Sequence, residues 1–138
     1  MNRTDFQRLT ELRIKEAQIL LGSACPHGSY YLAGYAIECA LKACIAKQTK
    51  QYDFPDKQLV GQVYKHDPGA LLKAAGLEGD LNNETQQNKD FDKNWVIVLN
   101  WSEESRYDFV ISEKEAADLF DTIVHPKNGV LQWLKKRW

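Results

Sequence analysis

Apolar residues recur at helical spacing along most of the chain. An apolar residue at every third or fourth position marks the buried face of an amphipathic helix. The first such helix is predicted to open with a capping box formed by Thr4 and Gln7, and to end before Pro26. Its expected buried face is made of Phe6, Leu9, Ala17, Leu20, Leu21 and Ala24.

A second helix is predicted from about Ser29 to Lys47, and its apolar residues cover almost the whole circumference. A helix that is apolar all round is typical of the centre of a domain. Glu38 and Lys42 are the only charged residues between Ser29 and Ala46, and their spacing of four places them on one face. They form either a structural ion pair or part of a site, because an unpaired buried charge is too costly.

Residues 48–65 contain a proline and a glycine without sustained periodicity, which predicts a loop that holds at most a short turn. Asp67 is then predicted to cap a short helix that has Pro68 at its first position and ends at Gly76. This short helix is expected to be sharply bounded at both ends.

Apolar residues at helical spacing return between Phe91 and Leu99, and predict a helix that begins anywhere from Asn83 onward. The run from Trp95 to Leu99 also fits a buried strand, because periodicity alone does not separate the two in short apolar runs. Helix is favoured, since no second strand is available to pair with it.

Residues 100–110 are predicted to form a connection, and Ser112 with Glu115 is predicted to form a capping box that opens the last helix. One apolar phase continues across Pro126, which predicts a single long helix kinked at that proline. The expected fold class is therefore all-α, with one domain over residues 1–138.

Composition narrows the class of protein without giving its activity. The 138 residues are 43% hydrophobic and carry a net charge of -1, so global charge neither supports nor excludes RNA binding. The three cysteines lack CxxC spacing, and we expect packed, reduced thiols. The polar N-terminal residues and the lack of a long apolar run predict a soluble cytoplasmic protein.

Two polar segments carry the candidate chemistry. His66 is a candidate acid, base or donor, although a histidine before a helix is also a common polar surface residue. Arg106 offers a planar fork for phosphate or carboxylate, and Trp101 and Tyr107 either stack on a base or anchor the core. No histidine or cysteine pairs at ligand spacing, and no phosphate-binding glycine loop occurs, so we expect neither a metal nor a cofactor.

Three phrases together resemble the HEPN family, the higher eukaryotes and prokaryotes nucleotide-binding helical domains. They are Ser29 to Ala43, Tyr64 to Asp67, and Trp101 to Tyr107. The resemblance implies an up-and-down bundle of four to five helices that forms a homodimer. It also implies a role beside a nucleotidyltransferase-type partner in a toxin–antitoxin or defence system.

Many HEPN proteins cleave RNA with an arginine and a histidine four to six residues apart. Here no histidine follows Arg106 until His125, so this motif is absent. The resemblance therefore favours an RNA- or nucleotide-binding module. The alternatives are a metal-independent ribonuclease with His66 and Arg106 as catalytic residues, and a non-catalytic helical module for protein interaction.

We hypothesise that six polar residues meet around one groove. The residues of this set are Glu38, Lys42, His66, Asp67, Arg106 and Tyr107. In such a groove Lys42 and Arg106 would hold phosphate, Glu38 would orient the arginine, and His66 would be the acid or base. The rival hypothesis is a buried polar network that fixes helix packing, marked by complete mutual pairing and no open cleft.

Overall fold

The computed structural model describes residues 1–49 and 57–138, and every regular element in these residues is a helix. The predicted all-α class is confirmed, with more and shorter helices than expected. The elements are α1 (Arg3–Gly22), α2 (Pro26–Gln48), α3 (Lys57–Val63), α4 (Pro68–Ala74), α5 (Glu78–Gln87), α6 (Lys89–Leu99), the 3-10 helix η1 (Glu103–Tyr107), α7 (Glu113–Val124) and α8 (Val130–Lys135). None of the helices in the described ranges combines the length and apolar character needed to cross a bilayer.

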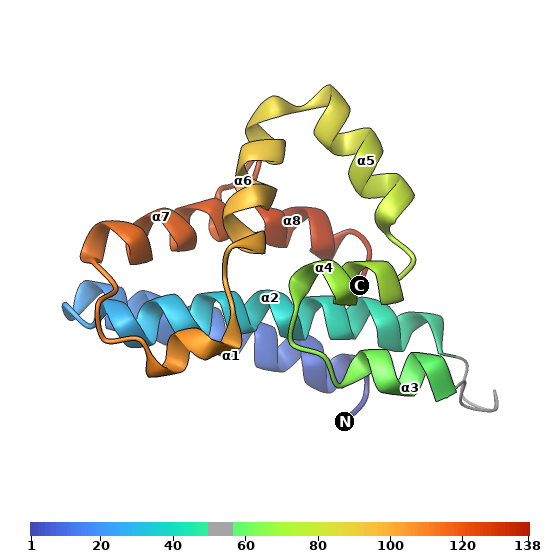
Figure 1. The fold of residues 1–138 in the computed structure, drawn as a ribbon, viewed down its shortest axis with the longest axis horizontal. Coiled ribbons are helices and arrows are strands. Elements are labelled where there is room, and N and C mark those ends of the chain that lie inside the picture. The colour runs from blue at the N-terminus through green and yellow to red at the C-terminus, as the bar shows by residue number, and fades with distance from the viewer. Residues whose placement is uncertain (50–56) are drawn as a thin grey trace.

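The central element is α2, as its apolar circumference predicts. It runs alongside α1 and also contacts α4, η1, α7 and α8, so that helices cover it on several sides (Figure 1). Small residues make this close packing feasible: Ala33, Gly34, Ala36, Ala40 and Ala43 of α2 are all buried. A Cβ atom at Gly34 would overlap the ring of Trp101, so only glycine fits there.

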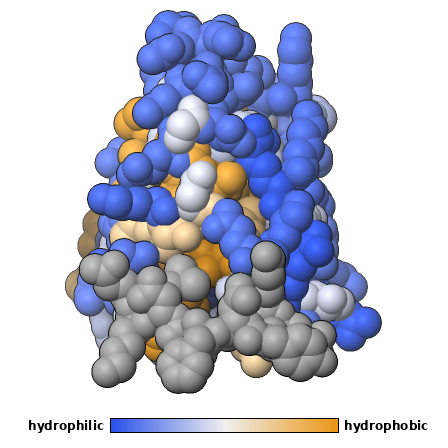
Figure 2. Space-filling model, turned by 90° about the vertical axis from the view of Figure 1, so that its right-hand side faces the viewer, coloured by the Kyte–Doolittle hydropathy of each residue, from blue (hydrophilic) through white to orange (hydrophobic). Residues whose placement is uncertain are grey.

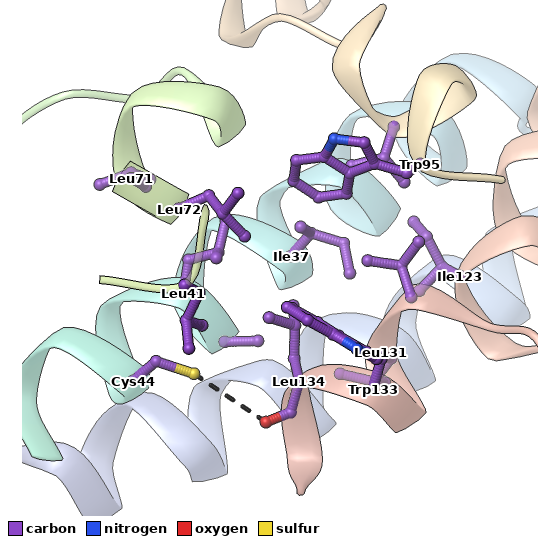
Figure 3. Packing of buried hydrophobic residues seen from close by; sticks show 14 of the residues in the cluster. Ile37, Leu41, Cys44, Leu71, Leu72, Trp95, Ile123, Leu131, Trp133 and Leu134 are labelled. Atoms are coloured by element: carbon purple, nitrogen blue, oxygen red, sulfur yellow. Dashed lines mark hydrogen bonds between the residues drawn. The ribbon is translucent and has the colours of Figure 1, made fainter. Parts of the chain in front are cut away.

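The core lies between α2 and the helices of the second half of the chain. Ile37 and Leu41 of α2 point among leucines of α4, Trp95 of α6 and residues of α7 and α8 (Figure 3). The thiol of Cys44 lies 3.9 Å from the carbonyl oxygen of Leu134, which links the C-terminal half of α2 to α8. Burial of apolar surface thus joins segments far apart in the sequence.

Two predicted helix starts, at Asp67 and Ser112, are confirmed, and the first helix start is corrected. The Asp67 carboxylate accepts the N–H of Ala70 at 2.7 Å, and the Ser112 hydroxyl accepts the N–H of Glu115 at 3.1 Å. Around α1 the capping box is formed by Asn2 and Asp5, not by Thr4 and Gln7. An asparagine side chain accepts a backbone N–H at a helix start as well as threonine does, and Asn2 lies two residues before the predicted cap Thr4.

The other helix boundaries lie at different residues from those predicted. Helix α2 starts at Pro26, because proline suits the first helical position. The predicted helix before Leu99 is confirmed over the apolar run, but Asn88 interrupts it and caps α6 through the N–H of Phe91. Part of the predicted loop forms α3, while residues 50–56 of that loop lie outside the described residues.

The prediction of one long last helix is wrong, because the helix ends before Pro126. His125 is extended, with φ -49° and ψ 128°, since a residue before proline is sterically kept out of the helical region. Its Nδ1 atom accepts the backbone N–H groups of Lys127 and Asn128 at 3.2 and 3.0 Å. These bonds stabilise a turn instead of a kink, so α7 and α8 are separate helices.

Candidate functional site

The candidate site is built around Glu38, a carboxylate buried in the middle of α2 with 1% of its surface exposed. Lys42, one turn later, places its Nζ atom 2.7 Å from the Oε1 atom of Glu38. The predicted contact within this pair is therefore present. Burial strengthens it, because little water screens the two charges.

His66 joins the same carboxylate from the segment that precedes α4. Its Nδ1 atom lies 2.9 Å from Glu38 Oε1, and its Nε2 atom lies 3.1 Å from Oε2 of Glu103. The ring is 45% exposed, whereas Glu103 is 28% exposed. Two carboxylates thus fix the plane of the imidazole, which can donate to both only when it is protonated.

Arg106 belongs to the same cluster through Glu103. Its NH1 atom lies 3.7 Å from Glu103 Oε2, and its guanidinium lies 4.8 Å from the centre of the Tyr107 ring. Both residues stand on η1, whose N-terminus is capped by the hydroxyl of Ser102. The short helix η1 therefore carries an acid that contacts His66, together with a cation and an aromatic side chain that lie beside that acid on the same helix.

Two hollows flank this polar cluster. One, of about 380 Å³, is lined by Lys65, His66, Asp67, Trp101, Ser102, Glu103 and Glu104, and is called the His66 hollow below. The other, of about 500 Å³, is mostly apolar and includes Lys42 and Cys39 in its lining. Of the two residues that contact Glu38, Lys42 lines the apolar hollow and His66 lines the His66 hollow. Seen from the right of Figure 1, apolar residues gather in the middle of the surface, with hydrophilic residues above them (Figure 2).

Three buried polar atoms of this region have no hydrogen-bond partner among the described residues. They are Oε2 of Glu38, Nε1 of Trp101 and Oγ of Ser105. Complete mutual pairing would mark a network that serves packing alone. That signature is not met here, since one oxygen of the central carboxylate is unpaired and His66 borders a hollow.

The structure brings together most of the predicted set. Lys42 and His66 both contact the Oε1 atom of Glu38. Arg106 is linked to His66 through Glu103, whose Oε2 atom lies near both. The predicted contact between Glu38 and Arg106 is replaced by the contact between Glu103 and Arg106. Glu103 was missed, because its only local signal is a spacing of three from the arginine.

The remaining predicted residues lie at the edge of the cluster. Asp67 lines the His66 hollow, but its carboxylate is already used as the cap of α4. Tyr107 is 69% exposed and free to contact a ligand. Trp101 is 2% exposed and packs against Tyr31 with ring centres 6.2 Å apart, so it anchors the core rather than offering a face to a base.

The cysteines take no part in metal binding within the described residues, where no three histidine, cysteine or acidic side chains gather as ligands. Cys39 and Cys44 are buried free thiols, as predicted, whereas Cys25 is exposed. Burial, and next the nearby Glu38 carboxylate, raises the pKa of Cys39 to about 11. Cys39 therefore stays a protonated thiol, and is no nucleophile beside the site.

Among known proteins, no family model, no curated protein and no solved structure matches this chain. The functional argument therefore depends on the geometry of the cluster and on the chemistry of its side chains.

Proposed function

We propose that the chain is a HEPN-type up-and-down helical bundle that binds RNA or nucleotides at the His66 hollow. The observation that supports it is the exposed pair of Arg106 and Tyr107, with the guanidinium 4.8 Å from the ring centre, on the same short helix as Glu103. An arginine beside an exposed aromatic ring is a common platform for single-stranded nucleic acid, since one contacts phosphate and the other stacks on a base.

The charges of the hollow decide how such a ligand is oriented. Its lining holds the carboxylates of Asp67, Glu103 and Glu104 against the ammonium group of Lys65, so a phosphate inside it would be repelled. Carboxylates accept hydrogen bonds from ribose hydroxyls and from the amino groups of bases. The ribose and base therefore belong in the hollow, and the phosphate belongs at the exposed guanidinium of η1.

Arg106 has donors free for a phosphate. Its guanidinium carries five N–H groups and is 43% exposed, and the contact with Glu103 spans 3.7 Å. A ribose 2′-hydroxyl in reach of the Glu103 carboxylate would distinguish RNA from DNA. We therefore expect RNA or ribonucleotides to bind in preference to the corresponding deoxyribonucleotides.

A metal-independent ribonuclease is the second candidate, and one observation favours it. The buried Glu38 carboxylate holds Nδ1 of His66, as a carboxylate orients a catalytic histidine, and Nε2 lies beside Glu103 at the wall of the hollow. In that reaction Nε2 accepts the proton of a ribose 2′-hydroxyl, whose oxygen attacks phosphorus. The 5′ oxygen leaves and takes up a proton from water, while Arg106 stabilises the added negative charge.

The test combines binding and cleavage of labelled RNA in the presence of a chelator. Binding is followed by fluorescence anisotropy for the wild type, Arg106→Ala, Tyr107→Ala and His66→Ala. Arg8→Ala is the matched control, because Arg8 is an exposed cation of α1 without an ion pair among the described residues. The binding proposal predicts that Arg106→Ala weakens RNA binding about tenfold or more while the control does not.

The outcomes separate the candidates. Cleavage that disappears in both His66→Ala and Arg106→Ala establishes the ribonuclease. RNA that binds and stays intact establishes the binding module. Absence of both binding and cleavage in the wild type rejects both, and leaves a non-catalytic module for protein interaction.

We further propose that the chain forms a homodimer and acts with a nucleotidyltransferase-type partner in a toxin–antitoxin or defence system. What supports a protein contact is the exposed apolar segment after η1, where Phe109 is 86% and Val110 is 73% exposed. Light scattering on the wild type and on Phe109→Ser tests the dimer. A wild type that is monomeric at high concentration contradicts it.

A further inference from the structure

A small hollow that shares no residue with the site above lies where α8 and the turn before it meet α5 and α6. Its volume is about 190 Å³. The polar or aromatic lining residues used below are Glu84, Lys127, Gln132, Trp133, Lys136 and Arg137. We call this region the Trp133 hollow.

Positive charge dominates the Trp133 hollow. Three cations face one carboxylate, and that carboxylate, Glu84, already accepts from the amide of Asn88 at 3.4 Å. Lys127 and Lys136 are exposed, and neither has an ion pair among the described residues. This local excess contrasts with the net charge of -1 of the whole chain.

Arg137 forms one wall of the hollow. Its guanidinium lies 3.8 Å from the centre of the Trp133 ring, and its Nε atom is 3.2 Å from a carboxylate oxygen of Asp80. Stacking holds the guanidinium plane in place and leaves N–H donors at its edge. The third cation is therefore positioned by the ring beneath it.

An unpaired donor supplies a second, independent observation. Trp133 is 6% exposed, and its indole Nε1 is buried without a hydrogen-bond partner among the described residues. An indole N–H can only donate, so what it lacks is an acceptor. Buried donors are rarely left unpaired, and this one belongs to a residue that lines the basic hollow, which fits an anionic ligand with oxygen acceptors.

We propose that the Trp133 hollow binds a phosphate group. Phosphate offers several oxygen acceptors and a negative charge to Lys127 and Lys136, which have no ion pair among the described residues, and to Arg137, whose Nε atom is paired with Asp80. The hollow has room for roughly six water molecules at about 30 Å³ each, which is enough for a phosphate group. This proposal does not depend on the function assigned to the His66 hollow.

The test follows the indole N–H signal of Trp133 by NMR while inorganic phosphate is added. Trp133→Phe identifies the signal, since the chain has four tryptophans. We expect a saturable shift in the wild type, and about tenfold or more weaker binding in Lys127→Gln/Lys136→Gln. The matched control is Lys15→Gln/Lys73→Gln, which removes the same charge from exposed positions of α1 and α4 and is expected to bind like the wild type.

Further titrations identify the source of the phosphate. A shift with adenosine monophosphate and none with adenosine supports a phosphate site that accepts a monoester. A shift with inorganic phosphate alone supports a site for the free ion. Equal shifts with adenosine and its monophosphate, equal weakening in the two double variants, or no shift with any phosphate compound would each overturn the proposal.

Discussion

Gly34 offers the sharpest test of how the fold positions the site. It lies in α2 against the ring of Trp101, and a Cβ atom at residue 34 would overlap that ring. Trp101 directly precedes the segment that carries Glu103, which contacts His66. Gly34→Ala is therefore expected to displace the ring, destabilise the protein and loosen the contact between η1 and the centre of the site.

The magnitude follows from two opposing effects. Alanine favours a helix over glycine by about 0.5 to 1 kcal/mol. Overpacking a dense core costs about 1 to 3 kcal/mol, and complete loss of a buried tryptophan contact costs about 3 to 5 kcal/mol. Gly34→Ala is thus expected to lower the free energy of unfolding by about 1 to 4 kcal/mol.

Urea unfolding followed by circular dichroism measures this change. Gly79→Ala in α5 is the matched control, because nothing lies within 4 Å of a Cβ atom there. It makes the same chemical change in open space, so stability is expected to stay level or rise by about 0.5 kcal/mol. A Gly34→Ala protein as stable as the wild type, with an unchanged Trp101 signal, would refute the packing argument.

Two further predictions concern buried polar groups. Ser29 donates to the carbonyl of Ala17 at 2.8 Å between α2 and α1, so Ser29→Ala is expected to lower the free energy of unfolding by about 1 kcal/mol, measured in urea; no change would contradict it. Burial raises the pKa of Cys39 and Cys44 from 9.0 to about 11, so the unfolded chain loses these protons first. Stability should therefore fall as the pH rises from 9.0 to about 11, and only Cys25 should react quickly with a thiol reagent before unfolding.

Local signals predicted much of the fold. The caps at Asp67 and Ser112 were found because a side-chain oxygen and the N–H that it accepts lie three residues apart in the sequence. The central place of α2 followed from an apolar circumference that leaves only Glu38 and Lys42 charged between Ser29 and Ala46. Both kinds of signal lie within a few residues and need no knowledge of distant segments.

The break at Pro126 was not predictable from the apolar pattern. Both α7 and α8 contribute to one core, so the apolar phase continues although the helix does not. What ends α7 is the extended backbone of His125 and its acceptor Nδ1 atom, and what permits the turn is Gly129, where a Cβ atom would meet the backbone carbonyl of Ile123 at 2.7 Å. The spacing of apolar residues shows which face of a segment is buried. It does not show whether the helix continues through that segment.

The candidate site was also predictable only in part, because some of its contacts lie within one helix and others join distant segments. The contact between Glu38 and Lys42 follows from helical spacing, whereas the contact of Glu38 with His66 depends on tertiary packing. Glu103 and Glu104 are neighbouring acids in a connection, and only the spacing of three between Glu103 and Arg106 distinguishes them locally. Only the direction of η1 against α2 places the first of the two at His66.

The central position of α2 also determines how the native protein opens. Because α1, α4, η1, α7 and α8 all contact α2, no single one of them can detach and leave it free in solvent. Amide protons in the middle of α2 should therefore exchange with deuterium only through global unfolding, and report the full free energy of unfolding. The amides of η1, whose residues include none that is buried, should exchange much sooner. The polar cluster around Glu38 and His66 thus joins side chains of the well-protected α2 and of the weakly protected η1.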